Sequence, residues 1–583
     1  MPALPFTVST VHGPVTGYFD THPLRPTTSA KEHQNGGRQP VNKWLGIPYA
    51  QAKRFERPTA PEKWEEAREC FEFGSMFPQP PSNTEVLLSK LPGFILREGF
   101  GVSEDSHFVN VFAPGDVQEG EKLPVLVWIY GGALNNGSSE KAYYDPTEWI
   151  RSGMKDGQRC IVVTGNYRTN IFGFLSHPDV AAADPDGLCG NYGLYDCVAM
   201  LEWVQTNIHS FGGDPSNVTA FGQSAGAFIV SHLLVSGKKL FQKAVCQSGA
   251  VGTMMLRPPS KAYPAYSTIL SSLPSGPSPS APPSERFSAL RSAPTSALLA
   301  AHCASHSFNA LSLTLEPHAD GKGIWTEDTL ERLRRGEWDP WVESVVLGTT
   351  EDEGSAFAWG MKLNHPQAFD AYLTQFPSSV QPLIREKYLS PFPGGTHPPA
   401  DQLDFVTAPG SRLLTDQVFV NPVWDQAVAL AGAGGGARAG EEGEGRKGVK
   451  TYLYKLRTGV ETLLKFSPIK LGIMHSMDLP LLFSTSSLWA YDESSSDAKT
   501  ARAMGSRWMR FAATGDPDPE WKPFTPSSPS HLVFSYAGET TNESLEEFER
   551  QKLELHMDDT DKDKDTREGE EGAGEEVLGR TNE

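Results

Sequence analysis

The sequence predicts a doubly wound α/β fold, in which helices flank a large, mostly parallel central sheet. Apolar, β-branched runs recur along the chain with turn signals between them, and several are almost continuously apolar. Strands buried on both faces of a parallel sheet have this composition. Helical patterns such as residues 193–208 and 225–235 lie between the runs, and this alternation of strand and helix indicates one extended α/β core.

The expected strands are short and follow one another along the chain. They cover residues 108–112, 123–130, 160–167, 218–222, 243–247, 344–350, 449–456 and 531–536. Because strands and helices alternate through most of the chain, we expect a single domain over residues 1–540.

Three segments have compositions that do not suit a packed core. Residues 271–285 are rich in Pro and Ser, and residues 431–448 are rich in Gly, so both are expected to be flexible surface insertions. Residues 541–583 are acidic and almost free of aromatic side chains. Such a segment buries too little apolar surface to fold, and we expect a disordered tail there.

The charge balance argues against several classes of partner. The chain has 51 Lys and Arg against 71 Asp and Glu, a net charge of −20. It therefore lacks the basic excess that binds nucleic acid or an anionic membrane surface. No apolar run reaches the ~18–20 residues of a membrane helix, and the N-terminus has no basic region followed by an apolar one, so we expect no secretory signal.

The six cysteines show no paired spacing of the kind that binds a metal. Cys160 and Cys246 lie in apolar runs, where a free cysteine behaves as a small buried hydrophobe. This use of cysteine fits a reducing compartment.

The stretch A-F-G-Q-S-A-G, residues 220–226, places Ser224 between two glycines where a strand pattern gives way to a helix pattern. This arrangement is typical of a nucleophile elbow, in which small residues let strand and helix pass closely and the serine has a strained backbone. The following helix directs its N-terminus at the serine and favours negative charge there. A serine that only caps the helix is the alternative.

A nucleophilic serine needs further groups. A histidine oriented by a carboxylate must remove its proton, and backbone N–H donors must stabilise the anion that forms on the substrate carbonyl. Gly131-Gly132-Ala133, directly after the expected strand 123–130, can supply such donors. A tight turn between strand and helix is the alternative for this loop.

Further stretches carry longer motifs. They are NKWLGIPYAQAKRFERP, SEDSHFVNVFAP, the segment 190–227, LGTTEDEGSAF, LGIMHSMDLPLLF and RWMRFAATGDPDPEWKPF. Together they resemble the type-B carboxylesterase/lipase family, which includes cholinesterases and fungal lipases, over roughly residues 6–536. The resemblance implies an α/β-hydrolase fold with long inserted loops, in a member of the fungal, intracellular type.

Position by position, the resemblance implies a catalytic triad. Ser224 is the nucleophile, His475 in M-H-S-M-D is the base, and Glu353 in E-D-E-G is the acid. From chemistry alone the neighbouring Glu351 and Asp352 could also orient the histidine, so they remain open at this stage.

The resemblance also implies which groups surround the triad. The oxyanion hole is expected to consist of the backbone amides of Gly132, Ala133 and Ala225, with alanine at a position where many relatives have glycine. Ser248 and Asp478 fall at family positions near the triad, where they would orient the catalytic groups without reacting.

Gln223 is a further position expected to support the triad, and here it replaces the glutamate that cholinesterases carry before the serine. The loop 77–106 has no tryptophan to stack on a quaternary ammonium. We therefore do not expect a choline ester as substrate. Residues 87–100 are apolar enough to form a lid over an apolar pocket, and a packed surface loop is the alternative.

Secreted relatives close an early loop with a disulfide, and the two corresponding positions here are Phe77 and Ser106. Both cysteines are absent together, in agreement with the lack of a signal sequence. The sequence therefore predicts a cytoplasmic enzyme.

The resemblance implies a serine hydrolase that cleaves small-molecule carboxylic esters through an acyl-enzyme on Ser224. Such chemistry requires neither a metal nor an organic cofactor. Two alternatives remain: a lipase acting on long-chain acylglycerols at interfaces, and a non-catalytic, cholinesterase-like interaction protein.

Overall fold

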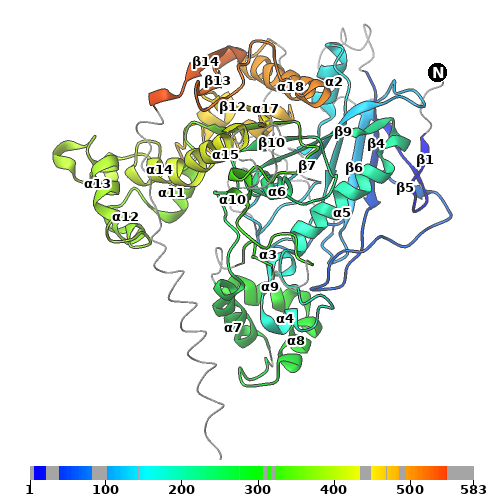
Figure 1. The fold of residues 1–583 in the computed structure, drawn as a ribbon, viewed down its shortest axis with the longest axis horizontal. Helices are drawn as coiled ribbons and strands as arrows, with labels where there is room; N and C mark the ends of the chain where they lie inside the picture. The colour runs from blue at the N-terminus through cyan, green and yellow to red at the C-terminus, as the bar shows by residue number, and fades with distance from the viewer. Residues whose placement is uncertain are drawn as a thin grey trace, which may run out of the picture.

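The computed structural model describes residues 6–20, 39–81, 101–140, 144–274, 276–305, 311–316, 322–432, 448–467, 469–484 and 494–547. Its central feature is an 11-stranded sheet with the order β14-β13-β12-β11-β10-β9-β7-β8-β6-β4-β3, and helices pack along this sheet (Figure 1). The strands from β13 to β8 in this order are parallel, and antiparallel strands complete both edges. The predicted α/β class is confirmed.

The strands of the large sheet are β3 (Tyr18–Asp20), β4 (Val41–Pro48), β6 (Phe108–Pro114), β7 (Leu123–Ile129), β8 (Ile161–Gly165), β9 (Gly213–Gln223), β10 (Lys243–Gln247), β11 (Ser344–Thr350), β12 (Lys450–Leu456), β13 (Ser530–Phe534) and β14 (Thr540–Ser544). A second, 3-stranded sheet consists of β1 (Thr7–Ser9), β2 (Pro14–Thr16) and β5 (Arg68–Glu69). Every strand expected from the sequence is present.

Two differences from the expected strands have physical causes. Strand β9 begins at Gly213, and its pairing with β7 is irregular until Val218, the residue at which the apolar pattern begins. Strand β4 is not among the strands expected from apolar runs, because it contains Lys43. The buried Lys43 ammonium lies 2.5 Å from the Asp20 carboxylate.

The α-helices are α2 (Thr147–Lys155), α3 (Asn170–Phe174), α4 (Pro178–Ala181), α5 (Tyr192–Asn207), α6 (Ala225–Leu233), α7 (Tyr263–Ser272), α8 (Pro283–Ser292), α9 (Thr295–Ala304), α10 (Thr329–Arg334), α11 (Ser355–Met361), α12 (Pro366–Leu373), α13 (Gln381–Leu389), α14 (Pro409–Leu414), α15 (Asn421–Gly432), α16 (Glu461–Phe466), α17 (Asp478–Leu482) and α18 (Ser496–Thr514). A π-helical turn, η7 (Thr415–Val420), joins α14 to α15. The helices predicted at 193–208 and 225–235 are α5 and α6. Among the described residues, no helix has both the length and the apolar composition needed to cross a bilayer.

Most of the helices pack on the sheet or belong to one of two outer groups (Figure 1). Helices α2 and α18 pack on each other and on β7, β9 and their neighbours, while α5, α6 and α15 pack along β9 to β12. Two outer groups, α7 to α9 and α11 to α14, extend from the sheet at separate places (Figure 1). The second of these has its own small apolar core.

An aromatic cluster joins the sheet to the segment that carries the candidate base. Trp128 of β7 and Phe221 of β9 lie 4.9 Å apart between ring centroids, and Trp128 lies 5.1 Å from Phe483, directly after α17. Trp149 of α2 completes the group at 6.0 Å from Phe483. Each such pair contributes about 0.5–1.5 kcal/mol beyond the burial of its area, so the chain after His475 is firmly anchored.

The predicted insertions and tail lie only partly within the described residues. Residues 271–272 end helix α7 and residues 283–285 begin helix α8, while residue 275 between them lies outside the described residues. Residues 433–447 and 548–583, which make up most of the Gly-rich insertion and the acidic tail, lie outside the described residues, as does the lid candidate 87–100. The predicted start of the tail at 541 is wrong, because residues 541–544 belong to β14 and pair with β13.

Candidate active site

Parallel strands bring the candidate catalytic groups to one edge of the sheet. Neighbouring strands β7, β9, β10 and β11 end directly before the glycine loop, Ser224, Ser248 and the acidic motif, respectively. Since carboxyl ends of parallel strands lie at the same edge, segments distant in the chain meet there, as is general for ligand sites of open α/β sheets.

Ser224 stands at a strained turn between β9 and α6. Its backbone has φ +56° and ψ −124°, a conformation that residues other than glycine rarely adopt. Its side chain makes no capping hydrogen bond to α6, so the alternative of a simple helix cap is wrong. Ser224 is the one partly exposed residue between Val218 and Ser236, which leaves its hydroxyl accessible.

The two glycines of the motif are required by close approach of the backbone. A Cβ at Gly226 would lie 1.9 Å from the Ile129 carbonyl oxygen, and one at Gly222 would lie 2.5 Å from the Gly226 carbonyl carbon. No side chain fits at these distances, so strand and helix can meet at Ser224 only with glycine at both positions.

The glycine loop packs against the elbow. A Cβ at Gly131 would lie 3.0 Å from the Ser224 Cβ, and Gly132 and Ala133 both have positive φ, +111° and +54°. Alanine therefore adopts the left-handed conformation that glycine favours, at a modest cost in free energy. No described group accepts a hydrogen bond from the backbone N–H of Gly132, Ala133 or Ala225, so these three amides can serve an oxyanion.

The candidate acid and base are in direct contact. His475 Nδ1 lies 2.5 Å from Glu353 Oε2, and the Glu353 side chain is fully buried. Its other oxygen, Oε1, accepts a hydrogen bond from the backbone N–H of Thr350 at 2.7 Å. Burial alone would raise the pKa of Glu353, but the attraction of the His475 ring, with smaller contributions from Ser248 and Thr350, keeps this pKa below its ordinary value.

The neighbouring acids have other partners. The Glu351 carboxylate is exposed and lies 3.3 Å from the Arg457 guanidinium. The Asp352 carboxylate accepts a hydrogen bond from the backbone N–H of Ile473 at 2.8 Å, so it holds the histidine loop without touching the ring. Of the three acids that chemistry left open, Glu353 is the one bonded to His475.

The other ring nitrogen of His475 faces Gln223. The two Nε2 atoms lie 3.0 Å apart, and because Nδ1 carries the proton toward Glu353, the Gln223 amide must be the donor. Within the described residues no hydrogen bond joins His475 to Ser224; the contact is made instead by the residue directly before the serine. Aromatic rings of Phe419 and Phe357 pack on the imidazole at centroid distances of 4.7 Å and 5.2 Å.

Asp478 and Ser248 lie behind the acid and base. The buried Asp478 carboxylate accepts hydrogen bonds from the Gln247 amide at 2.7 Å and the Tyr454 hydroxyl at 3.0 Å. Burial, together with the nearby charge of Glu353, raises the pKa of Asp478. Ser248 has a positive φ of +53°, and its buried hydroxyl acts on Glu353 without a well-formed hydrogen bond.

The sequence did not indicate four residues that shape the site: Phe357, Phe419, Gln247 and Tyr454. Phe419 lies in the π-helical turn η7, which no apolar pattern predicts. Gln247 precedes Ser248, so the Q-S-G stretch was the one signal from which it could have been found.

Ser106 and Phe77 occupy the two positions at which the resemblance implies a disulfide in secreted relatives, and both side chains are closely packed. The Ser106 hydroxyl lies 2.8 Å from that of Ser75, and the Phe77 ring packs on His107 at 4.9 Å. All six cysteines are free thiols, and five of them, including Cys160 and Cys246, are buried as expected. In the described part of the chain no His, Cys, Asp and Glu side chains cluster in a way that could hold a metal ion.

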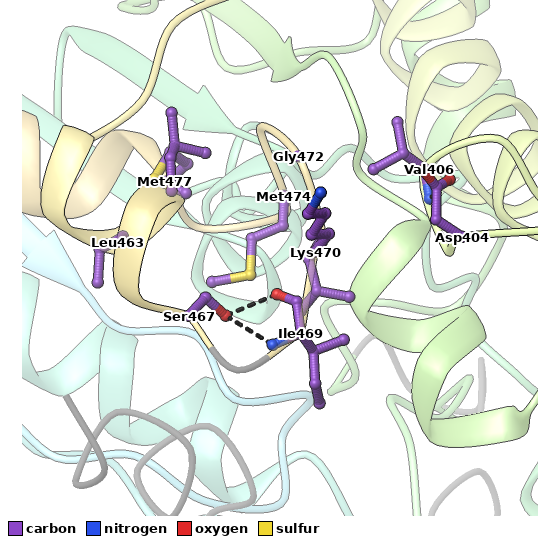
Figure 2. Close-up of a pocket in the computed structure, with 11 residues that line it drawn as sticks. Asp404, Val406, Leu463, Ser467, Ile469, Lys470, Gly472, Met474 and Met477 are labelled. Atoms are coloured by element: carbon purple, nitrogen blue, oxygen red, sulfur yellow. Dashed lines mark hydrogen bonds between the residues drawn. The ribbon is translucent and has the colours of Figure 1, made fainter.

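A cavity of about 280 Å³ adjoins the histidine loop (Figure 2). Its walls are mainly apolar, with Leu463, Val406, Met474 and Met477 among them, and Met474 directly precedes His475. An apolar group bound in this cavity would therefore contact the loop that carries the candidate base.

The chain is similar to esterases in both sequence and structure. The sequence model described as "Carboxylesterase family" matches residues 29–552. Carboxylesterase 3B of Mus musculus is 30% identical over 515 residues, which cover 82% of this chain and 80% of that protein. Lipase 2 of Geotrichum candidum is 33% identical over 370 residues, 57% of this chain and 63% of that protein. A solved thermophilic PNB esterase has a TM-score of 0.68 at 27% identity and covers 94% of this chain and 99% of its own.

Proposed function

Since this chain belongs to the carboxylesterase family, we propose that it cleaves carboxylic esters through an acyl-enzyme on Ser224, with His475 as general base and Glu353 as the orienting acid. Ester hydrolysis itself follows from the family and its esterase relatives. The assignment of residues is supported above all by the contact between His475 and the buried Glu353, 2.5 Å apart, at the sheet edge that carries the Ser224 elbow.

In acylation, His475 Nε2 takes the hydroxyl proton while Ser224 Oγ attacks the ester carbonyl carbon. The bond to the alcohol oxygen then breaks, and the alcohol leaves with the proton from the imidazolium. In deacylation, a water molecule gives a proton to His475, its oxygen attacks the acyl carbon, and Ser224 leaves with that proton. One ester and one water thus yield one acid and one alcohol.

Glu353 and the glycine loop stabilise the charges that arise in these steps. Glu353 accepts the Nδ1 proton in its hydrogen bond, fixes the tautomer with a free Nε2 lone pair, and stabilises the imidazolium. The amides of Gly132, Ala133 and Ala225, which have no acceptor among the described groups, would donate to the oxyanion, where each donor contributes about 3–4 kcal/mol to the transition state.

Kinetics of serine variants test this proposal. We expect Ser224→Ala to lose about 10⁴-fold or more of kcat on p-nitrophenyl acetate while melting at the wild-type temperature. Ser216→Ala, at an exposed serine earlier in the same strand, serves as the matched control and should keep its activity. A Ser224→Ala enzyme with most of its activity would contradict the proposal.

A lipase is the second candidate, because Lipase 2 of Geotrichum candidum is among the relatives. Rates on emulsified long-chain triacylglycerol and on dissolved short-chain esters separate the two functions. A rate that rises sharply above the solubility limit of the lipid would identify a lipase, and preference for dissolved esters would identify an esterase.

We also propose that the enzyme works in a reducing compartment such as the cytoplasm. All six cysteines are free thiols, and Ser106 and Phe77 occupy the positions of the family disulfide, whereas proteins of oxidising compartments usually form disulfides. Cell fractionation followed by activity staining tests this, and recovery of the activity from the secreted fraction would contradict it.

A further inference from the structure

The lone pair of the candidate base is occupied in this structure. Glu353 holds the Nδ1 side of His475, so Nε2 carries a single lone pair in the ring plane. The amide of Gln223 donates to it at 3.0 Å. One lone pair accepts one strong hydrogen bond, so while Gln223 is bound, His475 cannot receive the proton of Ser224.

The Gln223 side chain lies inside the site and not at the protein surface. Gln223 is the last residue of β9, its backbone lies opposite Gln247 of β10, and it is 2% exposed. Its Oε1 would lie 3.1 Å from a Cβ at Gly131, so the amide lies beside the glycine loop as well as the imidazole. The contact is therefore part of the built site and not a surface rotamer.

We propose that Gln223 is a positioning residue that holds His475 in a resting orientation, disengaged from Ser224, until bound substrate releases the ring. This inference rests on the proposed function, since it concerns the same serine and histidine. Contact between His475 and Ser224 would then form at the start of each turnover, after the Gln223 amide gives up Nε2.

A neutral amide suits this role because it can serve both protonation states of the ring. Its NH₂ group donates to the neutral imidazole, and after rotation its oxygen accepts from the imidazolium N–H. A carboxylate at the same position could only accept, so it would favour the protonated ring.

Acidic groups already lie close to the His475 ring, so it is important that Gln223 carries no charge. Glu353 faces Nδ1 from the loop after β11, and the buried Asp478 of α17 lies close enough to interact with the ring. Phe357 of α11 and Phe419 of η7 contact the imidazole with their aromatic rings. A third acid at position 223 would add to these two carboxylates, and among the described residues no Lys or Arg side chain is bonded to either of them.

Other acids of these elements are engaged elsewhere. Asp416 of η7 binds the Tyr388 hydroxyl and the Lys387 ammonium. The acids beside Glu353 bind the Arg457 guanidinium and the Ile473 backbone.

Two variants of full-length protein test the proposal through different readouts. For Gln223→Glu we expect the acid limb of the pH profile of kcat/KM to move upward by about one to three pH units, with activity recovering at alkaline pH. For Gln223→Met, which keeps the volume and removes the hydrogen bond, we expect inactivation by an organophosphonate to be about threefold to tenfold faster, the worth of one hydrogen bond. Gln375→Glu, an exposed glutamine after α12, controls for added charge and should match the wild type.

Each outcome decides the proposal. An unmoved acid limb in Gln223→Glu, or inactivation of Gln223→Met at or below the wild-type rate, would overturn it. Failure of the proposed function is a separate result, because it would show as ester hydrolysis that survives Ser224→Ala in a protein with Gln223 intact.

Discussion

The Asp352 carboxylate accepts a hydrogen bond from the backbone N–H of Ile473 at 2.8 Å, and the Asp352 N–H donates to the Ile473 carbonyl at 3.0 Å. Glu353 follows Asp352, and His475 lies two residues after Ile473. This double contact therefore sets the distance between the candidate acid and base. The contact requires glycine at position 472, because the φ of this residue is +64° and a Cβ there would lie 2.2 Å from the Asp352 carboxylate.

Removing the Asp352 side chain should loosen the base. We expect Asp352→Ala to lower kcat on p-nitrophenyl acetate by about 10- to 100-fold, because small displacements of catalytic groups cost this much. Asp352→Asn keeps a carbonyl oxygen for the Ile473 N–H and should stay within about threefold of wild type. Equal rates for Asp352→Ala and wild type would show that the loop needs no such anchor.

Glu353→Gln should remove the charge that orients and stabilises the imidazole. We expect kcat to fall by about 10³- to 10⁴-fold, as when the acid of a triad becomes an amide. Glu351→Gln, two residues away at the surface, should change kcat little because Glu351 pairs with Arg457 and not with His475. Steady-state kinetics of the pair measure this, and a larger loss in Glu351→Gln would reassign the acid.

The protein should require glycine at positions 222 and 226 in order to fold. Gly226→Ala places a methyl group 1.9 Å from the Ile129 carbonyl oxygen, so we expect a large fall in melting temperature or no folded protein. Gly360→Ala is the matched control, since Gly360 is exposed in α11 with no atom within 4 Å of the added Cβ. Alanine there should raise stability by about 0.5–1 kcal/mol. Thermal unfolding of both variants tests the contrast, and a Gly226→Ala protein as stable as wild type would contradict it.

Asp339 should make stability depend on pH. Burial raises its pKa to about 6 from 3.8, although hydrogen bonds from the Ser236 hydroxyl and the Gly237 N–H oppose this. Between these values the folded protein holds a proton that the unfolded chain has released, so the free energy of unfolding falls as pH rises from about 4 through 6. Asp339→Asn should therefore stabilise the protein more at pH 8 than at pH 4. Denaturant unfolding at both values measures this, and a difference independent of pH would refute it.

The central strands and the elbow could be predicted from the sequence because their signals are local. Continuous apolar runs mark buried strands, and the two glycines around Ser224 form a short motif that can be recognised in the sequence, although the contact that requires Gly226 is made with Ile129 of β7. Longer motifs then identified Glu353 and His475 through resemblance, and the structure pairs them.

The contacts across the site could not be predicted in this way. Which of three consecutive acids meets the histidine depends on how the loop after β11 turns, and Asp352 is directed to Ile473 by that turn. Likewise, Gln223 meets His475 because β9 ends beside a loop from a distant part of the chain. Phe419 reaches the ring through a π-helical turn that has no periodic signal.

Covalent labelling with an organophosphonate tests most directly whether Ser224 is the nucleophile activated by His475. Mass spectrometry of the digested protein should find one adduct per chain, on the peptide containing Ser224, and the adduct should be lost in Ser224→Ala and form far more slowly in His475→Ala. An adduct on another residue, or labelling of Ser224→Ala at the wild-type rate, would contradict the account.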